Sequence, residues 1–357
     1  MTKKVMLIGP ALTMGGMQRA TANFAELLQE SGFEVRLVLL VKRPHFFKIP
    51  SAISILEPEG FNLKGMDKWK TVAWLRMLMK QEKPELILVI QKFGASLASI
   101  ASWGLKIPLV ISERSSPHFQ WGWVLDTWMK IAFLLKKPNL CLAQTRYAAG
   151  FQQAYYSPKT RVEVFPNILR EVKSYPHVMR EPYVLAIGRF GDYLKGFDRL
   201  LRAFARVGNK DWKLVFAGGE FSNWEYAPLA EELGIVNRLI FTGKLEDTDE
   251  WMARASVFVI PSRSEGFPNA LTEAMAAGLA VISFDFKAGP SEIITHLEDG
   301  ILVKEGDIDA LAEQLHYLIE DKKMRIQLGE KARITSQRYS PKVLGHQLKN
   351  LLNELTR

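Results

Sequence analysis

Residues 257–285 read VFVIPSRSEGFPNALTEAMAAGLAVISFD and contain a strand, a loop, a helix and a second strand in succession. Continuous apolar runs such as VFVI and AVISF are typical of strands that are buried on both faces of a parallel sheet. The pattern predicts a helix that begins near Asn269 and leads back to the second strand. Such a unit implies a right-handed crossover in a doubly wound sheet.

The same alternation of apolar runs and helical stretches extends along the whole chain. The strands that it predicts begin at Val5, Glu34, Leu86, Leu109, Cys141, Val162, Tyr183, Lys213, Leu239, Val257 and Ala280. The sequence therefore predicts an α/β protein with two Rossmann-like, doubly wound domains. Ligands of such sheets bind beyond the carboxyl ends of the strands.

The length of 357 residues fits two domains. The segment 166–182 carries three prolines and many charges without periodicity, so it indicates a linker between them. We expect an N-terminal domain over 1–166, a linker over 167–181 and a C-terminal domain over 182–340. A helix over 341–357 is expected to pack back on the N-terminal domain.

The composition is that of an ordinary globular protein, with 48% hydrophobic and 24% charged residues. The single cysteine, Cys141, excludes an internal disulfide and is typical of a reducing compartment. The N-terminal run ends at Gly9-Pro10 and predicts a first buried strand rather than a signal peptide. No uninterrupted apolar run reaches the length of a transmembrane helix, so we expect a cytoplasmic protein whose only membrane option is peripheral contact.

Charge is distributed unequally between the halves. Residues 1–170 hold 23 Lys and Arg against 11 Asp and Glu, whereas residues 171–357 hold 24 against 27. This asymmetry indicates an anionic partner for the first half, such as nucleic acid, phosphorylated lipid or a membrane surface. Because the basic residues are diffuse and no RNA-binding aromatic motif is present, we expect no nucleic-acid partner.

Two glutamates flank the loop SEGFPN. Glu265 lies in the loop, and Glu273 lies in the first or second turn of the predicted helix. A carboxylate beside a helix N-terminus with free N–H groups suits a diphosphate together with sugar hydroxyls. The alternative is that Glu273 merely favours the helix dipole and Glu265 is a loop charge.

A second signal is GRFGDYLKG, residues 188–196. Arg189 ends the first predicted strand of the second half, and Lys195 stands just before a helical run. Two fixed cations at one sheet edge can stabilise a departing diphosphate. Taken alone, the pair would be read as surface cations.

The first half has a glycine pair, Gly15 and Gly16, between its first strand and its first helix. Glycine allows close backbone approach, and a helix N-terminus favours phosphate. The pattern is not the Gly-x-Gly-x-x-Gly dinucleotide fingerprint, which disfavours a dehydrogenase. A bare tight turn is the alternative.

Metal ligands are not indicated. Asp-x-Asp pairs occur at Asp247 and Asp249 and at Asp307 and Asp309, but both lie at predicted helix starts, where acids are common caps. We interpret both pairs as structural and expect no metal and no cofactor.

These motifs resemble those of the retaining glycosyltransferases of family 4, which have two facing Rossmann-like domains around a cleft, the GT-B fold. The resemblance spans almost the whole chain. It is most specific over residues 261–283, and residues 284–303 (FDFKAGPSEIITHLEDGILV) support it.

The resemblance implies a role for each candidate residue. Glu273 would bind the ribose hydroxyls of a nucleotide, and Arg189 and Lys195 would bind its diphosphate without a metal. Glu265 would position the donor sugar. Donor binding would also involve Gly15, Gly16, Gly266, Phe267, Pro268, Asn269, Ala270 and Leu271. Arg114 and His118, in ERSSPH after a strand, would lie on the acceptor side.

Two segments leave alternatives open. Residues 119–137 contain three tryptophans and a basic end, and residues 64–80 are basic and aromatic. Either could contact a membrane surface, and either could form a core helix.

We therefore expect a retaining glycosyltransferase that moves a hexose or N-acetylhexosamine from a nucleotide diphosphate sugar, foremost a UDP-sugar, to a glycan acceptor. A lipid-linked acceptor in surface polysaccharide assembly is expected at the cytoplasmic face of a membrane. The rival hypotheses are a nucleotide-sugar epimerase of similar fold and a non-catalytic anion-binding module.

Overall fold

The computed structural model describes residues 2–63, 66–116, 119, 121–156, 158–219, 224–245 and 248–356. The chain forms two compact units. Unit 1 comprises residues 1–168 and 341–357, and unit 2 comprises residues 169–340. The boundary between the units thus falls within the predicted linker over 167–181, and residues 169–181 belong to unit 2.

Unit 1 is built on a parallel sheet that has seven strands among the described residues, in the order β3-β2-β1-β4-β5-β6-β7. The strands are β1 (Lys4–Gly9), β2 (Glu34–Leu39), β3 (Ser54–Leu56), β4 (Leu86–Ile90), β5 (Leu109–Glu113), β6 (Leu140–Ala143) and β7 (Arg161–Val164). The helices are α1 (Gly16–Glu30), α2 (Asp67–Glu82), α3 (Lys92–Ala101), α4 (Trp123–Leu135), α5 (Arg146–Tyr155) and α13 (Pro341–Leu355).

Strand side chains divide the interior of unit 1 into two layers. Along β1, Val5 and Leu7 pack into the core that contains α1 and α13. Met6 and Ile8 point to the other face, into the core that contains α2, α3 and α4. This alternation is the period of two that a strand imposes, and burial on both faces explains why the strands read as continuous apolar runs.

Unit 2 repeats the architecture with a parallel sheet of six strands within the described residues, in the order β10-β9-β8-β11-β12-β13. The strands are β8 (Tyr183–Ile187), β9 (Lys213–Ala217), β10 (Leu239–Phe241), β11 (Val257–Ile260), β12 (Ala280–Asp285) and β13 (Ile301–Lys304). The helices are α6 (Phe197–Ala205), α7 (Ala227–Glu232), α8 (Asp249–Arg254), α9 (Asn269–Ala276), α10 (Pro290–Ile293), α11 (Ile308–Glu320) and α12 (Lys322–Ser336).

The predicted strands are all present, and two further strands were missed. β3 has three residues, none of them buried, and β13 follows Gly300 at the edge of its sheet. Each lies at an edge of its sheet and is not buried along its whole length. Among the described residues, no helix is both long enough and apolar enough to cross a membrane.

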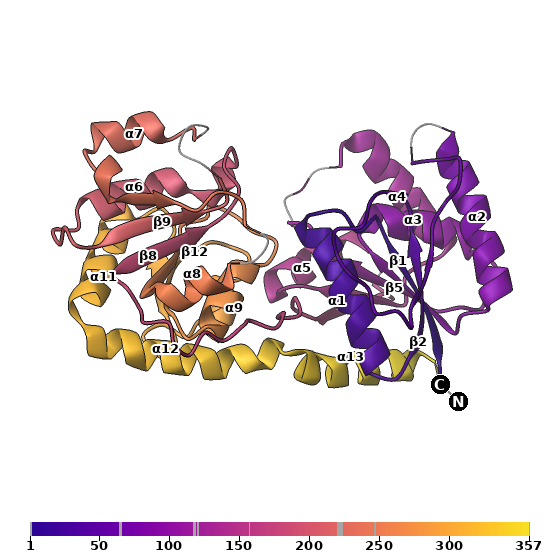
Figure 1. The fold of residues 1–357 in the computed structure, drawn as a ribbon. Helices are drawn as coiled ribbons and strands as arrows, with labels where there is room; N and C mark the ends of the chain where they lie inside the picture. Colours follow the sequence, from indigo (N-terminus) through magenta and orange to yellow (C-terminus); the bar gives the residue numbers. More distant parts are fainter. Residues whose placement is uncertain are drawn as a thin grey trace. The chain divides into compact units, whose positions relative to one another are not determined.

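The topology fixes where ligands can bind. In both sheets the strand order reverses at the first strand, with β1 between β2 and β4 and β8 between β9 and β11. The loops that leave the carboxyl ends of these central strands diverge at this point. In unit 2 they are the loop after β8 and the loop after β11, which carry the candidate residues (Figure 1).

Candidate functional site

The loop after β8 is tied to the loop after β11. It ends in a single 3₁₀ turn, Tyr193–Lys195, followed by Gly196 with φ of 66°. A Cβ on Gly196 would lie 2.1 Å from the carbonyl oxygen of Pro261, so only glycine allows this approach. The close contact sets Lys195 at the carboxyl edge of β11.

Lys195 and Glu265 form an ion pair at that edge. Lys195 Nζ lies 2.8 Å from Glu265 Oε1, and Ser262 Oγ donates to the same oxygen at 2.8 Å. Their side chains are 21% and 15% exposed, so water screens the pair only in part. The pair presents a cation and a carboxylate side by side, which suits a ligand with both phosphate oxygens and hydroxyl groups.

Arg189 is placed differently. The sequence placed it at the end of a strand, but β8 ends at Ile187, two residues earlier. The Arg189 side chain is 86% exposed and pairs with Asp192 at 3.3 Å. The structure thus joins Lys195 to Glu265 and shows Arg189 extended into solvent at the same sheet edge. The prediction that Arg189 and Lys195 grip one diphosphate remains a prediction.

The loop SEGFPN leads into α9, which begins at Asn269 as the sequence predicted. Phe267 is buried against the ring of Tyr339, with ring centroids 5.8 Å apart, and anchors the loop behind Gly266. Pro268 is the N-cap residue and is also buried. The Asn269 N–H donates to Phe267 O, and the Leu271 N–H donates to Pro268 O, both at 3.0 Å. These bonds fix the backbone around Ala270 where the loop enters α9, four residues after Glu265.

Glu273 lies in the second turn of α9 and is only 7% exposed. Arg170 Nη2 donates to its Oε2 at 3.0 Å. The same guanidinium binds Asp249 through two bonds, Nη1 to Oδ2 at 2.9 Å and Nη2 to Oδ1 at 2.5 Å. One arginine therefore bridges two buried carboxylates on different helices, α8 and α9.

Electrostatics favour the charged form of Arg170. Burial alone would lower the pKa of Arg170, but the hydrogen bonds to Asp249 and the charge of Glu273 raise the pKa above its ordinary value. The Asp249 side chain is fully buried and also accepts from the backbone N–H of Lys173 at 2.9 Å. Glu273 is thereby held at the helix face rather than left to rotate in solvent.

Arg170, Asp249 and Ser262 were not predicted from the sequence as residues of the site. Arg170 lies in the stretch interpreted as linker, and Asp249 was interpreted as a helix cap. It does lie in the first turn of α8, but its charge neutralises Arg170. Ser262 lies three residues before Glu265 and donates to it. That short spacing was the one feature of the sequence that could have indicated Ser262.

In unit 1 the glycine pair stands at the start of α1. Gly15 is the N-cap residue with φ of 155°, and Gly16 is the first helical residue and is exposed. A Cβ on Gly16 would meet no atom within 4 Å. The backbone at the N-terminus of α1 is therefore accessible to a ligand, and the proposed donor contact remains a prediction.

Arg114 is buried inside unit 1. Its guanidinium donates to Ser112 Oγ at 2.7 Å, Phe165 O at 2.8 Å and Asn167 Oδ1 at 3.0 Å. Burial lowers its pKa to about 9. Although the sequence placed it on the acceptor side, this geometry gives Arg114 a structural role, tying the end of β7 to β5. The other acceptor-side candidate, His118, lies outside the described residues.

A small cavity of about 100 Å³ opens at the carboxyl ends of β4 and β5. Glu113 lines it and is held by the backbone N–H groups of Lys92 and Ser115, both at 2.9 Å. Aromatic rings of Trp121 and Tyr155 form its walls. A carboxylate beside aromatic rings is an arrangement that can bind a sugar ring and its hydroxyl groups.

The described members of the two Asp-x-Asp pairs are bonded to other protein groups. Asp307 caps α11 through the N–H of Ala310 at 3.0 Å, and Asp309 pairs with Arg206. Asp247 lies outside the described residues. In the part of the chain that the structure describes, no group of three or more His, Cys, Asp or Glu side chains could hold a metal ion.

Comparison with known proteins matches both units to glycosyltransferases. The family model described as Glycosyl transferases group 1 matches residues 168–335, and that described as Glycosyltransferase Family 4 matches residues 14–169. HepE from Anabaena, solved in complex with UDP, superimposes with a TM-score of 0.81 at 21% identity over 98% of this chain and 100% of its own.

Two sequence relatives span nearly the whole chain. A Campylobacter jejuni N-acetylgalactosamine-N,N'-diacetylbacillosaminyl-diphospho-undecaprenol 4-alpha-N-acetylgalactosaminyltransferase is 30% identical over 96% of this chain and 97% of its own length. The amylovoran biosynthesis glycosyltransferase AmsD of Erwinia amylovora is 24% identical over 99% and 100%. With two parallel-sheet α/β domains of the GT-B class and this similarity, the chain belongs to the family-4 glycosyltransferases.

Proposed function

We propose that the protein is a retaining glycosyltransferase that transfers a hexose or N-acetylhexosamine from a UDP-sugar to a lipid-linked glycan. One observation carries the proposal: Lys195 and Glu265 form an ion pair in the loops that leave the carboxyl ends of β8 and β11, and α9, which begins four residues after Glu265, carries Glu273 bound by Arg170. The relatives that act on diphospho-undecaprenol glycans and the UDP complex of HepE support the choice of donor and acceptor.

Each group has a task in the transfer. Glu273 accepts hydrogen bonds from the ribose hydroxyls, and the first turn of α9 receives the diphosphate. Lys195, joined by Arg189 when a donor is bound, stabilises the negative charge that develops as the diphosphate departs, so we propose a metal-independent enzyme. Glu265 orients the sugar hydroxyls.

Retention follows from departure and attack on one face of the sugar. The bond from the anomeric carbon to the diphosphate oxygen breaks, and the acceptor oxygen bonds to the same carbon from the same side. The departing diphosphate oxygen takes the proton of the acceptor hydroxyl. This route needs no protein nucleophile.

Donor binding and transfer test the proposal together. In a thermal-shift panel of UDP, GDP, ADP and their sugars, saturating UDP or its sugar is expected to raise the Tm by about 5–10 °C. Incubation with a lipid-linked acceptor should yield a product whose anomeric configuration, read by NMR, equals that of the donor. A panel without a selective nucleotide, or conversion of the donor sugar without any acceptor, would contradict the assignment.

We also propose that unit 1 contacts the cytoplasmic face of a membrane through α4. Trp123 is 82% exposed and Leu134 is 74% exposed, while Met129 and Ala132 on the opposite side of the helix are buried. The helix is thus apolar on both sides. The neighbouring α2 adds Trp69, which is 51% exposed and contacts the ring of Trp128.

The net charge of unit 1 also supports contact with a membrane. Unit 1 carries 25 Lys and Arg against 12 Asp and Glu, a net charge of +13. An apolar helix face in a strongly basic unit fits the interface of an anionic bilayer, where rings insert between headgroups and lysines bind them.

A double substitution, Trp123→Ser with Leu134→Ser, is expected to lower the fraction of protein that sediments with vesicles of anionic lipid. Loss of two inserted side chains should weaken partitioning by roughly tenfold or more. The matched control, Val236→Ser with Ile334→Ser, changes two exposed residues of unit 2 and should leave sedimentation unchanged. Equal loss in both double variants would contradict a role for α4.

A further inference from the structure

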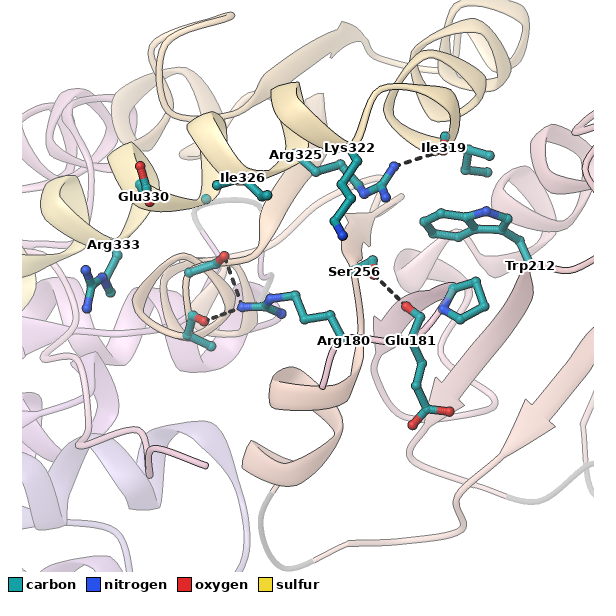
Figure 2. A pocket seen from close by; sticks show the side chains of 14 residues that line it. Arg180, Glu181, Trp212, Ser256, Ile319, Lys322, Arg325, Ile326, Glu330 and Arg333 are labelled. Atoms are coloured by element: carbon teal, nitrogen blue, oxygen red, sulfur yellow. Dashed lines mark hydrogen bonds between the residues drawn. The ribbon is translucent and has the colours of Figure 1, made fainter. Parts of the chain in front are cut away.

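A groove of about 580 Å³ lies beside α12 in unit 2 (Figure 2). It is at the opposite end of the sheet's strands from the donor-site candidates. Pro182, Trp212 and Ser256 line it, and each immediately precedes a strand, namely β8, β9 and β11. The donor-site candidates follow the other ends of β8 and β11. Because a five-residue strand is roughly 17 Å long, the groove is a separate site.

Helix α12 forms one long wall of the groove. The helical residues that line it are Lys322, Arg325, Ile326, Gly329, Glu330 and Arg333. Their spacing of three and four residues places all of them on one face of the helix. From Lys322 to Arg333 this face is roughly 16 Å long, so the groove is elongated.

Four cationic side chains line the groove, and two of them are bonded to the surrounding backbone. The Arg180 guanidinium donates to the carbonyl oxygens of Met252, Ala255, Ala277 and Gly278, which end α8 and α9. Arg325 donates to the carbonyl oxygens of Leu318 and Ile319 and lies 5.1 Å from the ring centre of Trp212. These side chains are engaged and rigidly placed.

The other two cations are available. Among the described residues, neither the Lys322 ammonium nor the Arg333 guanidinium has a hydrogen bond or ion pair. Figure 2 shows the Lys322 side chain extending from α12 toward Ser256, while Arg333 lies at the other end of the groove. Lys322 is also the first residue of α12, where a positive charge opposes the helix dipole.

Acidic residues do not cancel this charge. Glu181 is held by Arg254, whose Nε donates to it at 2.7 Å, which leaves Glu330 as the free carboxylate among the lining residues. Unit 2 as a whole holds 22 Lys and Arg against 26 Asp and Glu, a net charge of −4. A groove with four cations and two carboxylates is therefore a local exception in an acidic unit.

We propose that this groove binds an extended segment of an acidic glycan that carries phosphate or carboxylate groups. A compact anion could contact only one of the two free cations, whereas an extended one can reach both. The apolar side chains of Ile319 and Ile326 beside charged groups suit sugar rings, which present both C–H faces and hydroxyls. The source of the glycan rests on the proposed function; the groove would hold the polymer away from the reacting sugar.

The test measures ligand binding at the groove itself. Cys141, the chain's single cysteine, is buried, so a Lys323→Cys variant can be labelled selectively with an environment-sensitive fluorophore next to Lys322. The probes are monophosphate, diphosphate, triphosphate, longer linear polyphosphate and oligogalacturonates of increasing length, each titrated with saturating UDP present. Affinity is expected to rise with probe length, and the phosphate and carboxylate series identify which acid is preferred.

Matched variants give the expected magnitudes. Lys322→Ala and Arg333→Ala should each weaken the long probe roughly tenfold, the loss of one charge-assisted contact. Glu330→Gln should strengthen it, and Lys331→Ala, on α12 but outside the groove, should change nothing. Monophosphate binding as tightly as the long probes, equal loss in Lys331→Ala, or equal binding of a neutral oligosaccharide would overturn the proposal.

Failure of this proposal is distinguishable from failure of the proposed function. The Lys322→Ala and Arg333→Ala variants are expected to keep the UDP thermal shift and the transfer to a short acceptor. If the unmodified protein showed neither the UDP thermal shift nor transfer to a short acceptor, the proposed donor site would be contradicted. The probe titrations would still decide the groove proposal separately.

Discussion

Replacing Arg170 by alanine is expected to lower the free energy of unfolding of unit 2 by about 3 kcal/mol. Asp249 is fully buried, and the Arg170 guanidinium binds it through two charge-assisted hydrogen bonds. Without the guanidinium, the buried carboxylates of Asp249 and Glu273 lose the cation that bridges them. The backbone N–H of Lys173 still donates to Asp249, which keeps the expected loss at the lower end of the range for broken buried pairs.

The measurement is denaturant unfolding followed separately for the two units. The double variant Arg170→Met with Asp249→Leu removes both charges and should recover much of the stability that Arg170→Ala loses. Recovery of stability would show that Arg170→Ala destabilises unit 2 by removing a charge that Asp249 needs, rather than by simple loss of packing. If the double variant loses more free energy of unfolding than Arg170→Met and Asp249→Leu lose together as single variants, the bridge does not act through charge compensation.

The same substitution should weaken donor binding. Arg170 fixes the carboxylate of Glu273, so its loss leaves Glu273 free to take other rotamers. UDP affinity of Arg170→Ala, measured at a temperature where the variant is folded, should fall, and Arg170→Lys should fall less because it keeps the charge without the fork. An unchanged UDP affinity in Arg170→Ala would contradict the proposed contact between Glu273 and the ribose.

Patterns local in sequence predicted much of this molecule. The continuous apolar runs predicted both parallel sheets because each strand is buried on two faces, as β4 shows with all five residues buried. The start of α9 at Asn269 followed from a loop rich in Gly and Pro before an apolar helical period. The ion pair of Lys195 with Glu265 was not predicted as a contact, although both residues were selected for chemistry.

What the sequence could not predict depends on contacts between distant residues. Arg170 and Asp249 are 79 positions apart, and no periodicity links them. Arg114 was assigned to the acceptor side from its place after a strand, but only the folded chain shows Phe165 and Asn167 enclosing it. For α4, periodicity could not separate core from surface because apolar residues occupy both sides of the helix.

Lys195→Ala is expected to reduce kcat by a factor of about 100–1,000, the usual loss when one fixed donor to a developing charge is removed. Lys195 lies two residues before α6 with its ammonium on Glu265, whose Oε1 also accepts from Ser262, so Lys195 needs little reorganisation when the donor arrives. UDP-sugar consumption in single-turnover assays reads the chemical step directly. Lys210→Ala, an exposed lysine of the same unit, is the matched control and should retain full activity.

The pairing with Glu265 makes the loss informative about mechanism. If Lys195 serves the leaving group, Glu265→Gln should keep most of kcat while raising KM, because a neutral amide still bonds sugar hydroxyls. If Glu265 were instead the attacking group, Glu265→Gln would abolish transfer and Lys195→Ala would cost less. The ratio of the two losses therefore decides between departure assisted by a cation and attack by a protein carboxylate, and an inactive Glu265→Gln with near-normal UDP affinity would overturn the single-face mechanism.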